Sequence, residues 1–345
     1  MPALKIRSRF TEFSRCVLPL DDVQCKKKFT LVNTEVSTSG TSEMGSRLSE
    51  VLQDQSALYG VLNMMSHLSL TLLSLESSRI AQKEHTMKTV ISKDGTPIAF
   101  DRSGEGAPII LVVGAFNTSS TGAPLAAQLS EHFTVFNYDR RGRGMSGDTV
   151  PYAIEREIED LDALITEAGG SASVFGYSSG AILALMAAAR GLTITKLALY
   201  DPPFLVDAQS SRRFKDLVGQ LAELIASDHR GEAVELFQTQ AVGIPAEVVT
   251  RLRQAPFWPA LEDIAHTLVY EATLLGDMSA LAERMASIPV STLVISGGEI
   301  QVRMLQAAQA VADALPTASY RSLSGQTHDI IPQVLAPVLE EFFKG

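Results

Sequence analysis

The chain has 345 residues, 46% of them hydrophobic and 20% charged, a balance typical of a folded globular protein and not of a disordered one. Its formal net charge of -10 and the lack of a clustered basic stripe argue against a nucleic-acid partner, because phosphate binding needs grouped lysines and arginines. No apolar run reaches the roughly 18 residues of a membrane span. We therefore expect a soluble protein whose partner is a small-molecule substrate, with no nucleic acid and no membrane.

Residues 1–86 differ in composition from the rest of the chain. They hold a Ser/Thr-rich stretch at 37–42, the basic triplet Lys26–Lys28 and both cysteines, which predict neither a disulfide framework nor a zinc site. The spacing of apolar residues predicts one amphipathic helix over Leu58–Leu75. We interpret this part as an N-terminal appendage, flexible or partly helical, ahead of one domain at 87–345.

The first 20 residues carry four basic side chains against the single acid Glu12. This pattern occurs in organelle transit peptides, and also in basic leaders without a targeting role. The scarcity of cysteine suits a reducing compartment. We predict a cytoplasmic protein, with organelle targeting as the alternative.

The domain begins with a predicted hairpin, because the turn Lys93-Asp94-Gly95-Thr96 separates two short strand-like runs at 89–92 and 98–101. Further strands are predicted at 109–113, 133–138, 172–177, 194–200, 290–296 and 318–323. Helices are predicted at 124–129, 153–168, 179–189, 301–314 and 332–343. Such alternation predicts an α/β fold with a mostly parallel eight-stranded sheet flanked by helices.

One long segment interrupts this alternation. Residues 204–288 contain helical patterns but no buried strand, and they are too many for a plain crossover between two strands. We predict a helical lid at about 204–288, lying over the carboxyl edge of the sheet, where open α/β sheets bind their ligands. Its large apolar residues are interpreted either as pocket lining or as core.

A Gly-x-Ser-x-Gly motif at Gly176–Gly180 carries the central functional prediction. An apolar strand precedes it and a helix of small residues follows, which predicts a tight strand-to-helix turn that presents the hydroxyl of Ser178. We interpret Ser178 as a nucleophile. The structural alternative is that Ser178 or Ser179 caps the helix.

A serine hydroxyl needs a base to remove its proton, so a histidine must lie within reach. Of the six histidines, only His328 falls in the polar loop after the last predicted strand, at residues 324–329. We predict His328 as the general base. The alternative is a solvated loop histidine.

The chain from about Met87 to Gly345 resembles the α/β-hydrolase superfamily. The resemblance rests on three motifs: Gly176–Gly180, Tyr138–Gly147 and Gly325–His328. It implies the α/β-hydrolase fold and a serine hydrolase with its catalytic residues in the order Ser, acid, His. It also implies small carboxylic esters, lactones or related carbonyl compounds as substrates. No His-x-x-x-His with a paired carboxylate suggests a metal, and we expect neither a cofactor nor a metal.

The third triad residue departs from the family pattern. Most members place an Asp shortly after the seventh strand, where this chain holds Ile300, with Glu299 adjacent. Some members use the end of the sixth strand, which here holds Asp201 followed by two prolines that enforce an extended exit. We favour Asp201 as the acid, with Glu299 as the alternative.

The resemblance also implies an oxyanion hole built from backbone N–H groups of Ala115 and Ser179, with Phe116 as the alternative donor. Asn117 is interpreted either as a side-chain donor or as a turn residue. The stretch Asp139–Arg143 is not interpreted as a phosphate site, since the chain has no Gly-x-x-x-x-Gly-Lys-Ser/Thr motif. The resemblance implies that it is a structural loop whose Asp and Arg organise the neighbouring backbone.

These patterns together predict a hydrolase that cleaves ester-like carbonyl substrates through an acyl-enzyme on Ser178. Two alternatives stay open at this level. One is a cofactor-free haloperoxidase-like perhydrolase with the same triad, and the other is a non-catalytic protein that binds a ligand on the same fold.

Overall fold

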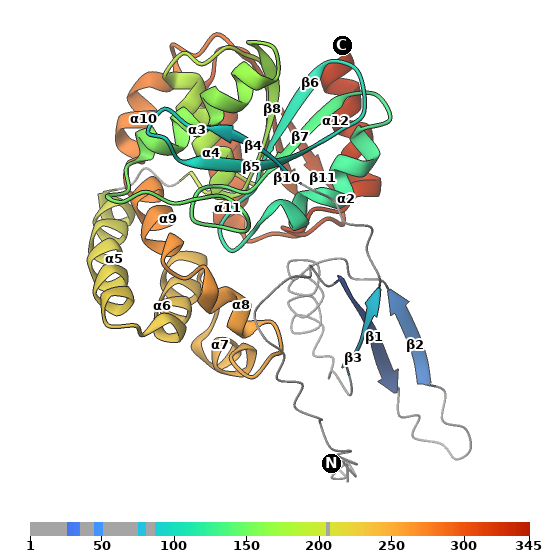
Figure 1. Cartoon of the computed structure of the whole chain (residues 1–345), viewed down its shortest axis with the longest axis vertical. Helices are drawn as coiled ribbons and strands as arrows, with labels where there is room; N and C mark the ends of the chain where they lie inside the picture. The colour runs from blue at the N-terminus through green and yellow to red at the C-terminus, as the bar shows by residue number, and fades with distance from the viewer. Residues whose placement is uncertain (1–25, 35–44, 51–74, 81–86, 205–207) are drawn as a thin grey trace.

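A computed structural model of the chain describes residues 26–34, 45–50, 75–80, 87–204 and 208–345. Its main body is an eight-stranded sheet with strand order β11-β10-β9-β8-β6-β7-β5-β4 (Figure 1). The strands are β4 (Lys88–Ile91), β5 (Pro97–Ser103), β6 (Pro108–Val112), β7 (Thr134–Tyr138), β8 (Ala172–Tyr177), β9 (Ile194–Tyr200), β10 (Ser291–Gly297) and β11 (Ala318–Leu323). The predicted eight-stranded α/β sheet is confirmed.

The sheet is parallel from β7 through β6, β8, β9 and β10 to β11. Only β5 runs opposite to the other strands of this sheet: it pairs antiparallel with β7 and, in the hairpin predicted from the Asp94-Gly95 turn, with β4. Because parallel strands end at the same edge, the residues that follow β6, β8, β9 and β10 meet at one rim of the sheet.

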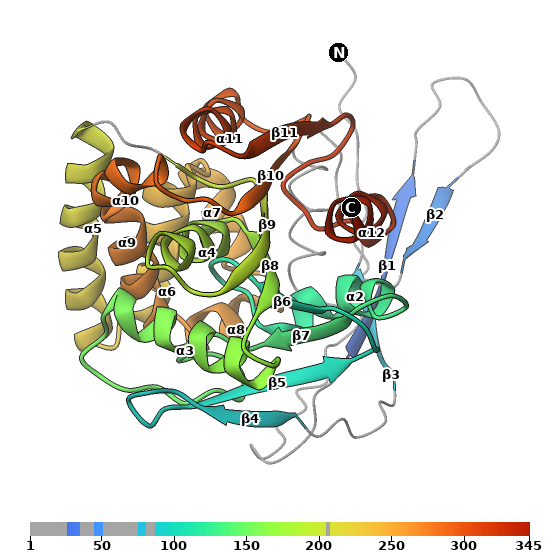
Figure 2. The same cartoon turned by 90° about the horizontal axis from the view of Figure 1, so that it is seen from above.

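Helices cover both faces of the sheet, as Figure 2 shows. On one face lie α3 (Ile154–Glu167), α4 (Ser179–Ala189) and α11 (Val302–Ala314), and on the other lie α2 (Ser119–Leu129) and α12 (Pro332–Lys344). Alternate side chains of β6 serve the two cores. Ile110 and Val112 pack with the first set of helices, while Ile109 and Leu111 pack with the second.

Helix α2 begins at Ser119, five residues before the predicted start at Pro124. Local propensity does not favour this start, since four of the five added residues are Ser, Ser, Thr and Gly and only Ala123 is a strong helix former. Tertiary contacts stabilise it: the Ser119 N–H donates to Asp139 at 2.7 Å, and the Asn137 side chain donates to the Ser119 carbonyl at 2.7 Å. The prediction was therefore too short because these partners are distant in sequence.

The segment between β9 and β10 is helical where it is described. It contains α5 (Ala208–Ala226), α6 (Arg230–Phe237), the π-helix η1 (Gln238–Val242), α7 (Ala246–Leu252), α8 (Trp258–Asp263), α9 (Thr267–Gly276) and α10 (Met278–Met285). We call residues 208–285 the helical insertion. Helices α9 and α10 contact α4 of the main body, and α5 packs on α9 (Figure 1). No helix within the described ranges is both long and apolar enough to cross a bilayer.

Within the first 86 residues, the structure describes three strands, β1 (Lys26–Thr34), β2 (Gly45–Glu50) and β3 (Leu75–Ile80). They pair antiparallel in the order β2-β1-β3. The helix predicted over Leu58–Leu75 lies outside the described residues up to position 74. The boundary between an appendage at 1–86 and a domain at 87–345 stays a prediction.

Candidate active site

Ser178 occupies the sharp turn between β8 and α4. Its backbone has φ 55° and ψ −127°, a conformation that is strained for a residue with a side chain. The flanking glycines make room for the turn: a Cβ on Gly176 would lie 2.6 Å from Ala181 Cα, and one on Gly180 would lie 2.3 Å from the carbonyl of Val112. Ser178 stands at the N-cap position of α4 but makes no capping hydrogen bond with its side chain.

The hydroxyl of Ser178 faces His328 instead. Oγ of Ser178 lies 3.1 Å from Nε2 of His328, although 150 residues separate the two in sequence. The loop that carries His328 is held from β9, since the Tyr200 hydroxyl donates to the carbonyl of Thr327 at 2.7 Å. The imidazole also lies against the ring of Tyr177, with centroids 5.0 Å apart. The structure therefore brings the predicted nucleophile and base within hydrogen-bonding distance.

Asp201 completes a chain of three side chains. Its Oδ2 lies 2.9 Å from Nδ1 of His328, while Oδ1 accepts the backbone N–H of Gly297 at 3.0 Å. The residue has φ 49° and is fully buried, and its own N–H donates to the carbonyl of Ile295. The His328 side chain is 42% exposed, whereas that of Asp201 is fully buried. Solvent therefore reaches the imidazole but not the carboxylate.

Glu299, the alternative acid, lies in the turn after β10 and is exposed. Its backbone N–H donates to the carbonyl of Gln326 at 2.9 Å. Because Asp201 occupies Nδ1 of His328 and Ser178 faces Nε2, both ring nitrogens already have partners. The geometry groups Asp201, and not Glu299, with the other two residues.

The loop after β6 lies directly against Ser178. A Cβ added to Gly114 would lie 2.8 Å from Cβ of Ser178, so glycine is needed at this approach. Ala115 and Phe116 follow, and Phe116 has φ 60°. The side chain of Asn117 is engaged inside the loop, where its Nδ2 donates to the carbonyl of Ala115 at 2.6 Å. This contact fits the turn interpretation of Asn117.

Ser179, the other residue of the predicted oxyanion hole, is the first residue of α4. The backbone N–H groups at a helix start have no acceptor within the helix, which leaves them free for a negatively charged oxygen. The hydroxyl of Ser179 is itself buried without a hydrogen-bond partner.

A buried cluster of ion pairs holds the loop after β6, which lies beside Ser178. Arg140 and Arg143, both nearly unexposed, contact Glu157 and Glu271. Nη1 of Arg140 donates to the carbonyl of Val113 at 3.2 Å, and Nη1 of Arg143 donates to that of Gly114 at 2.6 Å. The loop that precedes Ala115 is thus held by two guanidinium groups.

The arginines and glutamates of this cluster each stabilise the charged form of the other. Burial opposes the charged form of Arg140, yet Glu157 and Glu271 hold the pKa of Arg140 well above its ordinary value. Burial likewise acts to raise the pKa of Glu157, but the adjacent Arg140 outweighs it and lowers that pKa below its usual range. The structural role predicted for 139–143 agrees with these contacts, but no local signal pointed to Glu271, which is 131 residues from Arg140.

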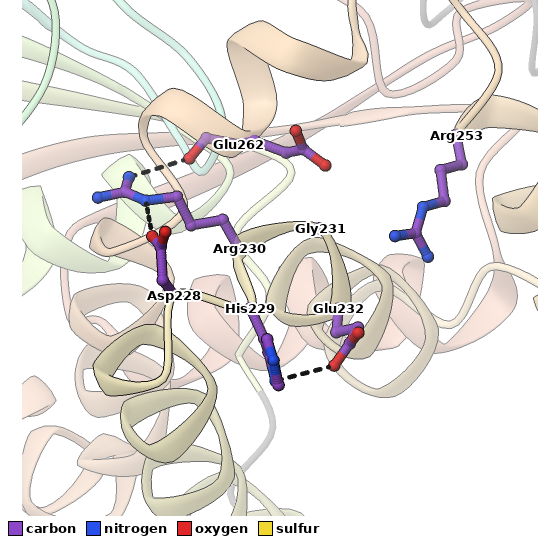
Figure 3. Close-up of a pocket in the computed structure, with 7 residues that line it drawn as sticks. All are labelled: Asp228, His229, Arg230, Gly231, Glu232, Arg253 and Glu262. Atoms are coloured by element: carbon purple, nitrogen blue, oxygen red, sulfur yellow. Dashed lines mark hydrogen bonds and ion pairs between the residues drawn. The ribbon is translucent and has the colours of Figure 1, made fainter.

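A polar hollow lies on the helical insertion and is lined by none of the residues described above. Its volume is about 400 Å³. The residues around it are Asp228, His229, Arg230, Gly231, Glu232, Arg253 and Glu262. Figure 3 shows two pairs among them, Arg230 with Asp228 and His229 with Glu232, while Arg253 stands apart and pairs with Glu235. Because these charged groups already have partners, we do not interpret the hollow as a ligand site.

An eight-stranded, mostly parallel sheet whose strand-to-helix turn presents a serine to a histidine and an aspartate defines the class of α/β hydrolases. A sequence profile described as "Alpha/beta hydrolase family" matches residues 109–334, and the chain belongs to that family.

Individual relatives agree with this assignment. A solved α/β hydrolase from Sphaerobacter thermophilus DSM 20745 is 51% identical with a TM-score of 0.69, and the match covers 74% of this chain and all of that one. The enol-lactonase from Burkholderia xenovorans LB400 shares the fold, with 23% identity, a TM-score of 0.57, and coverage of 75% of this chain and 100% of its own. The uncharacterized hydrolase YraK of Bacillus subtilis (strain 168) is 28% identical over 146 residues, which are 41% of this chain and 54% of YraK. The chain therefore matches about half the length of this curated relative.

Proposed function

We propose that the protein is a serine hydrolase that cleaves small carboxylic esters or lactones through an acyl-enzyme. One observation carries the proposal: Ser178, His328 and Asp201 form a continuous chain with heavy-atom distances of 3.1 Å and 2.9 Å. This is the arrangement that activates a serine hydroxyl, because the base can take its proton while the acid orients the imidazole.

In the first half of the reaction, His328 takes the proton of Ser178 as Oγ bonds to the substrate carbonyl carbon. The carbonyl π electrons move to the oxygen, and the backbone N–H groups of Ala115 and Ser179 donate to that oxyanion. When the tetrahedral intermediate collapses, the bond from the carbonyl carbon to the leaving oxygen breaks, and His328 gives its proton to that oxygen, which becomes the alcohol. The acyl group stays on Ser178.

In the second half, water attacks the acyl carbon while His328 takes one of its protons. Collapse of this second intermediate breaks the bond to Ser178, which recovers its proton, and the carboxylic acid leaves. The buried carboxylate of Asp201 stabilises the imidazolium in both halves and keeps Nδ1 protonated. The exposed edge of His328 gives the hydrolytic water a route to the acyl carbon.

Ester-like substrates are supported by two features. The site holds a nucleophile, a base and backbone donors suited to a tetrahedral oxyanion, which is the intermediate of acyl transfer. A relative that shares the fold is an enol-lactonase, and a lactone is an internal ester. The helical insertion, which we propose to act as a lid, selects among such substrates. The cytoplasm stays our proposed location.

A fluorophosphonate probe combined with a series of 4-nitrophenyl esters tests the proposal. The probe should label the wild type, and Ser178→Ala should abolish labelling and lower ester turnover by on the order of a million-fold. Ser291→Ala, at an exposed serine that begins β10, is the matched control and should retain both properties. Absence of labelling and of turnover in a folded wild type would instead favour a protein that only binds its ligand.

A further inference from the structure

The π-helix η1 holds a buried side chain with no hydrogen-bond partner. Gln238 is 1% exposed, and both its Nε2 and Oε1 lack a partner. A buried amide left unpaired is costly, so most such groups in folded proteins are satisfied, and exceptions occur where a ligand supplies the missing partner. Single π-helical turns also concentrate at functional sites.

Contacts at its two ends place η1 across the rim that carries Ser178. At one end, the ring of Phe237 packs edge-on against Phe116, in the loop beside Ser178, with centroids 5.6 Å apart. At the other end, the carbonyl of Val242 accepts Nη2 of Arg303 at 2.6 Å. Arg303 lies in the first turn of α11, which follows β10 at the same edge of the sheet. The segment that contains Gln238 therefore bridges the two sides of the site.

Two arginines near this segment have no acidic partner among the residues that the structure describes. Arg303 donates only to neutral oxygens, the carbonyl of Val242 and the side chain of Gln301. Arg213, on α5, has its Nε buried without an acceptor. Burial and the nearby charge of Arg213 together lower the pKa of Arg303, so the two guanidinium groups repel each other.

The surroundings of Arg213 and Arg303 differ from those of the arginines in the ion cluster beside Ser178. There, each buried arginine contacts a carboxylate, as the Arg140 pair with Glu157 illustrates. Arg213 and Arg303 are only partly buried, and neither contacts a carboxylate within the described part of the chain, so two like charges lie near each other in a protein whose net charge is -10. An anion from outside would supply the missing partner.

We propose that Arg213, Arg303 and Gln238 bind a carboxylate carried by the substrate, so that the enzyme prefers esters or lactones whose acyl chain ends in an acid. This inference rests on the proposed function. The carboxylate accepts hydrogen bonds from the two guanidinium groups and from Nε2 of Gln238 while the ester carbonyl lies at Ser178. Because Gln238 is unexposed, η1 shifts when the substrate enters.

Two esters of equal acyl length test this preference: mono(4-nitrophenyl) glutarate, which bears the carboxylate, and 4-nitrophenyl valerate, which does not. We expect kcat/KM for the glutarate ester to exceed that for the valerate ester by at least about tenfold. Arg303→Gln, Arg213→Gln and Gln238→Leu should each lower kcat/KM for the glutarate ester by about tenfold or more and change the valerate value less than about twofold.

Gln240→Leu is the matched control, because Gln240 is the same residue type on the same π-helix and is only half-buried. It should leave both esters unchanged. Equal kcat/KM for the two esters in the wild type would overturn the proposal, as would a loss on both esters alike in the three variants.

A binding measurement separates this inference from the proposed function. Glutarate itself should bind the wild type and Ser178→Ala equally in calorimetry, and Arg303→Gln should weaken that binding by about tenfold or more. If glutarate binds but no ester is cleaved, the hydrolase proposal fails and the anion site stands. If esters are cleaved but glutarate neither binds nor inhibits, the anion site fails alone.

Discussion

The carboxylate of Asp201 accepts the backbone N–H of Gly297 at 3.0 Å, from the neighbouring strand β10. This contact uses Oδ1 and turns Oδ2 toward His328. The Asp201→Asn variant could keep the Gly297 contact through its remaining oxygen, but it would present an N–H to Nδ1 and favour the wrong tautomer of His328. We expect kcat to fall roughly ten-thousand-fold while the unfolding midpoint changes little.

Glu299→Gln is the matched variant at the competing acid. Since Glu299 is exposed and Nδ1 of His328 already has a partner, kcat should stay within about twofold of the wild type. Steady-state kinetics on one 4-nitrophenyl ester compares the two variants directly. A large loss in Glu299→Gln with little loss in Asp201→Asn would reassign the acid.

Glu271→Gln tests whether the ion cluster holds the insertion against the main body. The change leaves Arg140 and Arg143 with one carboxylate less in a site that excludes water, and breaking a buried pair in this way costs about 3–5 kcal/mol. Urea unfolding should report that loss, and kcat should fall because the loop before Ala115 loses its support. Glu235→Gln breaks the more exposed pair with Arg253 and should cost no more than about 1 kcal/mol.

Gly114→Ala tests the close approach of the loop to the nucleophile. The added Cβ would lie 2.8 Å from Cβ of Ser178, so either the loop or the serine must move. We expect kcat to fall about a hundredfold or more, because a displacement of about 1 Å in a reacting group has effects of that size. Gly219→Ala is the control. That glycine lies within α5 with open space around it, and the change should stabilise the protein by about 0.5–1 kcal/mol. Unchanged kcat in Gly114→Ala would contradict the geometry of the site.

His266 gives the stability a predicted dependence on pH. Burial lowers the pKa of His266, and the nearby Asp148 opposes that shift without cancelling it. The folded state therefore favours the neutral imidazole. This contribution is complete above the unfolded pKa of about 6.5 and is lost progressively as the pH falls below it. Urea midpoints measured between pH 5 and pH 8 should fall on the acid side, and His266→Gln should reduce that slope. An identical slope in the variant would rule out His266 as its source.

Much of the fold follows from local patterns. The hairpin turn at 93–96, the apolar runs of the parallel strands and the small residues after Ser178 each act on their immediate neighbours, so a sequence pattern suffices to predict them. The choice of Asp201 over Glu299 likewise depends on two adjacent prolines, and the structure places Asp201 beside His328.

Features that depend on distant partners could not be predicted in the same way. The early start of α2 requires Asp139, and the support of the loop after β6 requires Glu271. Asp139 lies in the stretch interpreted as a structural loop, but its contact with Ser119 could not be predicted from that stretch. Glu271 is not marked by local sequence at all, because a single acid in a helix is usually a solvated one. Gln238 could not be predicted from local sequence either. Only the structure shows that its side chain is buried without a hydrogen-bond partner.

The contacts of Glu271 with two main-body arginines also determine how the insertion could be exchanged. Helix α9 belongs to the insertion in sequence, but its Glu271 pairs with arginines of the main body. A chimaera that replaces residues 208–265 with the corresponding segment of a relative retains α9 and the electrostatic anchor. One that also replaces residues 267–276 must bring an acid to the position of Glu271; otherwise Arg143 loses its carboxylate partner and Arg140 keeps only Glu157.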